Sequence, residues 1–204
     1  MKKTIEEKKK DILIVATKLF AEKGYEGTTM AEIANLANVG FGTVATYYEN
    51  KENLLFKCVE EPMPSFLEAA LRFNSHPQNY EDEIKRMTFH HFKLFSENRL
   101  YLLLLIHVTA QWEKYLNPFL IANKAAKEIA DKIAILVQNG QNDGKLAEAD
   151  PDILANSYIS FLLGLFLSHT DYFTDDLLKL FAENSVRLFG LRKAVLLLKV
   201  ILID

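Results

Sequence analysis

The chain has 204 residues and a formal net charge of −3, and the 50% of residues that are hydrophobic suffice for a sizeable core without metal or disulfides. One cysteine excludes an intramolecular disulfide, and no segment has the roughly 18 uninterrupted apolar residues of a membrane span or the pattern of a secretory signal. Few glycines and prolines among many Leu, Ala, Lys and Glu residues predict an all-α, cytoplasmic protein without a membrane partner.

Charge is distributed unevenly along the chain. Residues 1–59 carry nine lysines and eight acidic residues, whereas residues 60–204 carry fifteen basic and nineteen acidic residues. A weakly basic end on an acidic body would turn that end toward phosphate groups. The lysines of the first ten residues also fit a plainer interpretation, a solubilising terminus.

The first part of the chain predicts three helices. The first begins after Thr4, which has a glutamate three residues later in capping-box spacing, and ends at Gly24. Thr29 opens the second with the same spacing, and a short third helix spans 41–48. Asn38 stands between the last two, where a tight turn needs a positive φ. This layout is that of a helix-turn-helix, which presents its last helix to a DNA groove.

The third helix is expected to bury Val44 and Tyr48, which lie four residues apart. Its outer face would then carry Phe41, Gly42, Thr43, Thr46 and Tyr47. Asn50 caps a fourth helix and places Lys51 in its first turn, where a cation opposes the helix dipole. That small cost is understandable if a phosphate lies nearby, although Lys51 also fits an ordinary surface lysine.

These residues resemble the DNA-binding head of the tetracycline-repressor (TetR) family of bacterial transcriptional regulators. The stretches that carry the resemblance are 21–25, 29–37, 42–44, 47–48 and 50–55. The resemblance implies a three-helix DNA-binding domain in residues 6–60 and a larger helical ligand-binding and dimerisation domain in residues 61–204. It further implies a homodimer that binds palindromic double-stranded DNA, usually as a repressor, without a cofactor, and leaves it when a small-molecule effector binds.

By the same resemblance, Thr29 contacts the DNA backbone, Thr43 and its neighbours enter the major groove, and Tyr47 and Lys51 hold phosphates. The chain departs from the family at Gly40, where a capping side chain is missing, and at Ala45, where a phosphate-contacting tyrosine is common. The third helix contains no Arg, Lys, Asn or Gln, the residues that read guanine or adenine bidentately. We therefore expect readout through threonine hydroxyls, Phe41 against thymine methyls and DNA shape, favouring A·T-rich half-sites.

Beyond residue 60, two prolines are expected to divide the fourth helix, as a hinge or as a simple connection. The predicted helices are 65–74, 79–96, 99–109, 112–139 with a break near Pro118, 150–172 and 174–189, with a loop over 139–146. The last two are apolar on more than one face, which predicts a two-fold dimer through a four-helix bundle. The apolar tail 191–204 has no assigned role.

Aromatic side chains are dense in the middle of the chain, and most are expected to be core. With a few polar partners they would also suit a pocket for an apolar or aromatic effector. The candidate effector residues are Phe66, Phe89, His90, Tyr101, His107, Gln111, Trp112 and Phe161.

Two rival functions differ from a regulator. An enzyme or metal site is unsupported, because the five histidines show no metal-binding spacing and the chain has no phosphate-binding glycine loop or nucleophile elbow. The alternative is a helical ligand-binding or interaction protein with a degenerate DNA head, which the substitution at Ala45 and the weak positive charge would fit.

Overall fold

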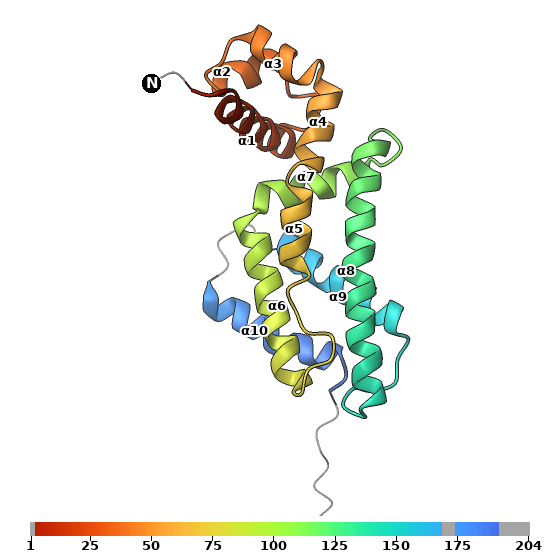
Figure 1. Cartoon of the computed structure of the whole chain (residues 1–204). Coiled ribbons are helices and arrows are strands. Elements are labelled where there is room, and N and C mark those ends of the chain that lie inside the picture. The colour runs from red at the N-terminus through yellow and green to blue at the C-terminus, as the bar shows by residue number, and fades with distance from the viewer. Residues whose placement is uncertain (1–2, 169–173, 192–204) are drawn as a thin grey trace, which may run out of the picture. The chain divides into compact units, whose positions relative to one another are not determined.

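The computed structural model describes residues 3–168 and 174–191, and the regular structure of this part is α-helical (Figure 1). Its β pairing is limited to one isolated antiparallel bridge between Leu146 and Leu191. The helices in chain order are α1 (Ile5–Lys23), α2 (Met30–Leu36), α3 (Phe41–Tyr48), α4 (Lys51–Glu60), α5 (Met63–Ala70), α6 (Tyr80–Glu97), α7 (Arg99–Ala110), α8 (Leu116–Asn142), α9 (Pro151–Ser168) and α10 (Asp175–Leu188). The predicted all-α fold is confirmed.

The ends of the first helices are set by the side chains that the sequence indicated. The Thr4 hydroxyl accepts a hydrogen bond from the Glu7 amide at 3.2 Å, and the Glu7 carboxylate accepts one from the Thr4 amide at 2.7 Å, which completes a capping box. Gly24 ends α1 with a φ of 71°, and Thr29 caps α2. Asn38 has the predicted positive φ, at 54°.

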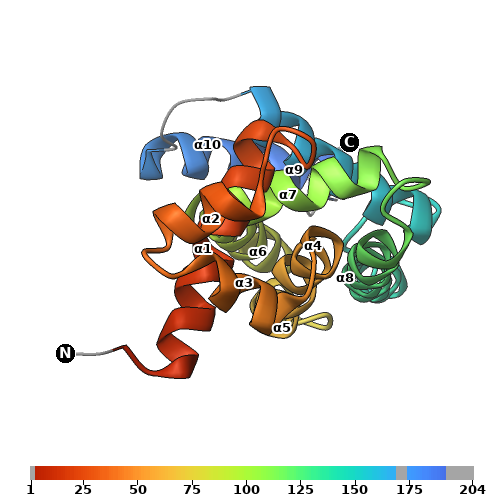
Figure 2. The same cartoon turned by 90° about the horizontal axis from the view of Figure 1, so that it is seen from above.

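Helices α1 to α4 pack together (Figure 2), and their buried side chains form a small apolar core. The core side chains repeat at helical spacing and include Ile12, Ala16, Leu19, Phe20, Ile33, Ala34, Val44, Tyr48, Leu54 and Leu55. Helices α1 and α4 also pack against α7. The head, helices α1 to α4, therefore packs together with α7, which belongs to the body, the part of the chain after α4.

By packing, the chain forms two compact units. The first comprises Met1–Arg72 and His91–Ile129, and the second comprises Phe73–His90 and Ala130–Asp204. The first unit thus contains the head, α5, α7, the end of α6 and the start of α8. The second contains the start of α6, the end of α8, and helices α9 and α10. The predicted functional boundary at residue 60 is a different division and stays a prediction.

The two prolines after α4 divide the chain as expected, because α4 ends at Glu60 and α5 begins at Met63. Pro62 occupies the N-cap position and Pro64 lies in the first turn, where a helix needs no amide donor. Helix α5 therefore starts and ends earlier than the predicted 65–74.

The prediction for α8 was wrong at both ends and at its middle. Residues 112–115 form a turn, so α8 begins at Leu116 and Pro118 lies in its first turn without breaking it. The helix then continues through Gly140, where a loop was predicted. A Cβ at Gly140 would lie 2.5 Å from Cδ1 of Leu146, so this glycine permits close packing and does not end the helix.

The second unit has a core of large side chains joined by buried hydroxyls. Tyr158 donates to the Thr88 hydroxyl at 3.2 Å, and Thr88 shares a hydrogen bond of 2.8 Å with Ser185. The Tyr158 ring also packs at 5.2 Å from the ring of Phe189. These bonds fix the register of α6, α9 and α10 in the core of this unit.

Helix α9 is the helix of the described part that is long and apolar enough to cross a membrane, with a mean hydropathy of 1.3 over 18 residues. One such helix is weak support for a membrane span, because core helices pass the same test. Polar residues interrupt it, and Ala155, Tyr158, Leu162 and Phe166 are buried along one side. The continuation predicted to residue 172 and the tail 192–204 lie outside the described residues.

Candidate functional site

Helix α3 has one buried side and one open side. Val44 is fully buried and Tyr48 is 3% exposed, as predicted, whereas Phe41 is 59% exposed. Gly42 and Thr46 are also exposed, and Thr43 and Tyr47 are half-buried. A Cβ at Gly42 would meet no heavy atom within 4 Å. The five α3 residues proposed for DNA contact therefore lie on a helix whose outer face is accessible.

The buried side of α3 is anchored to α1. The Tyr48 hydroxyl donates to the carbonyl oxygen of Lys9 at 3.2 Å, and burial raises the pKa of Tyr48 well above its usual value, so the hydroxyl keeps its proton. The Lys9 ammonium lies 5.8 Å from the centre of the Tyr47 ring. These contacts hold the C-terminal end of α3 in place.

The N-terminal end of α3 lacks a side-chain cap, because Gly40 stands at the N-cap position. Its backbone carbonyl accepts from the Thr43 amide at 2.8 Å, so one amide of the first turn is paired. The Thr46 hydroxyl donates to the Gly42 carbonyl oxygen at 2.7 Å. Thr46 therefore has acceptor capacity left for DNA, while its proton is already used within the helix.

Thr29 and Lys51 lie at the starts of α2 and α4. The exposed Thr29 hydroxyl accepts from the Glu32 amide at 3.1 Å, which leaves its proton available to a phosphate oxygen. Lys51 is half-buried, and its ammonium donates to the carbonyl oxygens of Tyr25 at 2.8 Å and Thr28 at 2.9 Å. Sequence reasoning missed these partners, because they lie 26 and 23 residues before Lys51.

The turn that follows α1 also contacts the turn between α7 and α8. Lys114 forms an ion pair of 2.5 Å with Glu26, and the rings of Tyr25 and Tyr115 lie 5.6 Å apart. The hydrogen bond from Lys114 keeps the pKa of Glu26 below its usual value. The His107 ring would lie 3.5 Å from a Cβ at Gly24, and an α7 side chain thus reaches the end of α1.

The candidate effector residues fall into separate groups. In the first unit, the Phe66 ring packs 5.4 Å from Tyr101, whose hydroxyl donates to the Val59 carbonyl oxygen at 2.8 Å. His107 accepts from the Gln111 amide group at 3.1 Å if its Nε2 is unprotonated, and both lie near the head. Trp112 is 50% exposed in the turn before α8. The remaining three, Phe89, His90 and Phe161, are half-buried in the second unit.

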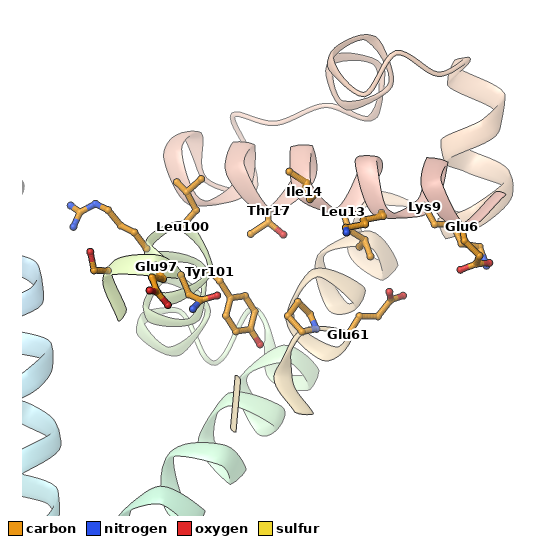
Figure 3. Close-up of a pocket in the computed structure, with 14 residues that line it drawn as sticks. Glu6, Lys9, Leu13, Ile14, Thr17, Glu61, Glu97, Leu100 and Tyr101 are labelled. Carbon is orange, nitrogen blue, oxygen red and sulfur yellow. The ribbon is translucent and has the colours of Figure 1, made fainter. Parts of the chain in front are cut away.

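A groove of about 780 Å³ lies in the first unit between α1, the α4–α5 junction and the start of α7. Leu13 and Thr17 of α1 and Tyr101 of α7 point into it from opposite sides (Figure 3). Of the predicted effector residues, Tyr101 lines this groove. This groove was not predicted from the sequence. The residue that could have indicated it is Ile14, which is apolar but lies off the buried stripe of α1 and is 58% exposed.

Metal binding has no geometric support in the part of the chain with described coordinates. In residues 3–168 and 174–191, no group of three His, Cys, Asp or Glu side chains lies close enough to hold an ion. Cys58 is buried in the head, and burial raises the pKa of its thiol to about 12. The expectation that no metal or cofactor is needed stays a prediction.

Known proteins resemble this chain in its head and in its whole fold. The family model described as "Bacterial regulatory proteins, tetR family" matches residues 12–58. The uncharacterized HTH-type transcriptional regulator YhgD of Bacillus subtilis (strain 168) is 29% identical over 169 residues, which are 78% of this chain and 82% of that protein.

Solved structures agree with the fold along most of the chain. A bacterial regulatory protein in the tetR family from Rhodococcus RHA1 superposes with a TM-score of 0.77 at 20% identity, over 91% of this chain and 98% of the other. The structure of AibR in complex with isovaleryl coenzyme A and operator DNA superposes with a TM-score of 0.73 at 21% identity, over 91% and 100% of the two chains. At 20% and 21% identity, these similarities show a shared fold and nothing more specific.

Proposed function

We propose that this chain, which belongs to the TetR family of bacterial transcriptional regulators, represses transcription from a palindromic operator and leaves it when an apolar or aromatic effector binds. The observation that carries the proposal is the open outer face of α3, on which Phe41 is 59% exposed while Val44 and Tyr48 anchor the helix. The family consists of transcriptional regulators, and the proposal assigns no catalysis to the chain. A cytoplasmic location follows from that function.

The proposed DNA interface has a central part and two flanks. On α3, Phe41, Gly42 and Thr43 approach base edges, and Thr46 and Tyr47 lie beside the backbone. Thr29 donates to a phosphate from the start of α2. Since these groups include no bidentate reader of guanine or adenine, we expect A·T-rich half-sites, and a binding selection that returns G·C-rich core positions would contradict this interpretation.

Two recognition helices are needed to read a palindrome, and α9 with α10 supplies a surface for dimerisation. Ile153, Leu167 and Leu180 on these helices are 67%, 51% and 58% exposed. Exposed large apolar side chains on neighbouring helices favour burial against a second copy. We propose a two-fold dimer through this surface, and a monomer at micromolar concentration in analytical ultracentrifugation would refute it.

For the effector, we propose an apolar small molecule held by the aromatic residues of the body. In the first unit the candidates Phe66 and Tyr101 form one aromatic contact, and in the second unit Phe89, His90 and Phe161 form a separate candidate group with apolar and polar surface. His107, Gln111 and Trp112 belong to the same predicted set, and their position near the head favours a part in transmitting the effect. The AibR complex makes short-chain acyl thioesters the first class to test.

One experiment tests both halves of the function. The dimer is titrated by fluorescence anisotropy onto DNA that flanks its own gene, and isovaleryl coenzyme A, free fatty acids and aromatic compounds are then added in turn. Tight binding that one of these compounds reverses is expected. An effector is limited to its difference in affinity between the DNA-bound and released states, so a reversing compound must bind the free protein more tightly.

The uncapped start of α3 at Gly40 favours one alternative, a ligand-binding protein whose head no longer holds DNA. That protein would bind a compound of the same panel and show no affinity for any DNA above the nonspecific level. The anisotropy titration therefore separates the two functions.

A further inference from the structure

We propose that Lys51 supports DNA binding mainly as a positioning residue, which fixes the turn before α2, and that a phosphate contact is not its main contribution. The inference rests on the proposed function and changes the role of Lys51, for which the family resemblance implies a phosphate contact. It starts from the intramolecular contacts of the Lys51 ammonium, which join the first turn of α4 to residues 25–28.

The Lys51 ammonium is surrounded by groups of the head itself. It donates to two carbonyl oxygens, of Tyr25 at 2.8 Å and of Thr28 at 2.9 Å, and it lies 4.0 Å from the centre of the Tyr25 ring. An ammonium has three donors, and a position over an aromatic face is favourable for a cation. The two carbonyl oxygens occupy two of these donors, so a phosphate would share the ammonium with both carbonyls and the ring and could accept from one N–H without displacing them.

The turn that Lys51 holds is otherwise a short, tightly folded segment. The Thr28 amide donates to the Tyr25 carbonyl oxygen at 3.3 Å, and the Thr28 hydroxyl donates to the Gly24 carbonyl oxygen at 2.8 Å. Thr28 is fully buried, so its carbonyl oxygen would be costly to leave without a donor. Loss of Lys51 would remove a charged donor from two carbonyls at once.

The position of this turn determines where α2 begins. Thr29 follows directly and caps α2, which packs against α3, so a shift of the turn moves the recognition helix. The Tyr25 ring also stacks on the ring of Phe20 in α1, at 5.9 Å between centres and nearly parallel. Tyr25 thus contacts both Lys51 of α4 and Phe20 of α1, which explains why a lysine stands where the helix dipole disfavours it.

Two variants and a matched control separate positioning from phosphate contact. Lys51→Met removes the charge, and Tyr25→Leu removes the ring beneath it while every charge stays in place. Lys57→Met is the control, because Lys57 lies on the same helix and pairs with Glu60 at 2.5 Å. Affinity for operator DNA is measured at several salt concentrations, and amide hydrogen exchange is measured in the free protein.

We expect Lys51→Met to weaken DNA binding about tenfold to a hundredfold with an unchanged slope of log Kd against log salt. Tyr25→Leu should reproduce the effect, and the double variant should lose much less than the product of the two single losses. In the free protein both variants should exchange the Glu32 and Ile33 amides of α2 about tenfold faster or more, whereas Lys57→Met should not.

A salt slope smaller by about one unit in Lys51→Met, with unchanged exchange in α2, would overturn the proposal and return Lys51 to the phosphate contacts. Independent losses in Tyr25→Leu and Lys51→Met would overturn it as well. If the unchanged protein binds no DNA, the proposed function fails, and the exchange measurement still decides whether Lys51 holds the turn.

Discussion

Replacing Phe41 with alanine should weaken operator binding and leave the folded protein intact. The Phe41 side chain is 59% exposed, and a phenylalanine has about 200 Å² of surface to bury, so roughly 120 Å² is available to DNA. If about half of that area covers a thymine methyl, burial at about 25 cal/mol per Å² contributes about 1.5 kcal/mol at each half-site. That corresponds to a loss of roughly tenfold per half-site.

The assay is fluorescence anisotropy with operator DNA in which single thymines are replaced by deoxyuridine, which lacks the methyl group. At the contacted thymine, deoxyuridine and Phe41→Ala should each weaken binding, and together they should weaken it little further. The salt slope should not change, because no charge is lost. Leu120→Ala is the control, since Leu120 is 52% exposed on α8 and has no proposed DNA contact. Wild-type affinity in Phe41→Ala would refute apolar readout by α3.

Three further predictions concern the free protein. Thr4→Ala removes a complete capping box and should lower the free energy of unfolding by about 1 kcal/mol, seen as a lower midpoint in urea. Tyr158→Phe removes the hydroxyl that donates to Thr88 in the core and should lower the free energy of unfolding by about 1 kcal/mol in the same measurement. An unchanged midpoint would show that this hydrogen bond does not stabilise the fold. Since burial raises the pKa of Cys58 to about 12, the thiolate is scarce near pH 8, and iodoacetamide should label Cys58 only after unfolding, so rapid labelling of the native protein would contradict its burial.

The helix ends of the head were predictable because they are determined by capping residues close in sequence. A capping residue such as Thr4 or Asn50 acts on amides two or three residues away, and Asn38 tolerates its positive φ by itself. These signals do not depend on the rest of the fold. The same reasoning anticipated the missing cap at Gly40.

The body was less predictable, because proline and glycine have more than one use. The sequence predicts a break at Pro118 and a loop at Gly140, whereas Pro118 lies in the first turn of α8 and Gly140 gives room to Leu146 within it. Each prediction follows a valid local rule, because proline often breaks a helix and glycine often marks a loop. Which use of proline or glycine applies depends on tertiary neighbours, and these cannot be inferred from the local sequence.

The candidate site shows the same limit. The outer face of α3 followed from the four-residue spacing of Val44 and Tyr48, which is a local pattern. The partners of Lys51 could not be inferred, because they are backbone carbonyls of a distant turn and any residue provides a carbonyl. The sequence predicted that aromatic residues of the body could line a pocket, but which of them lie together depends on how the helices pack.

In the proposed DNA interface, the open space around Gly42 would make operator preference easy to alter in evolution. A Cβ introduced there would meet no heavy atom within 4 Å, and replacing a glycine inside a helix by alanine usually adds about 0.5–1 kcal/mol of stability. An asparagine, glutamine or arginine at that position would supply the bidentate hydrogen bonding that α3 now lacks. A single codon change could therefore retarget a descendant of this regulator to new promoters without a compensating mutation in its scaffold.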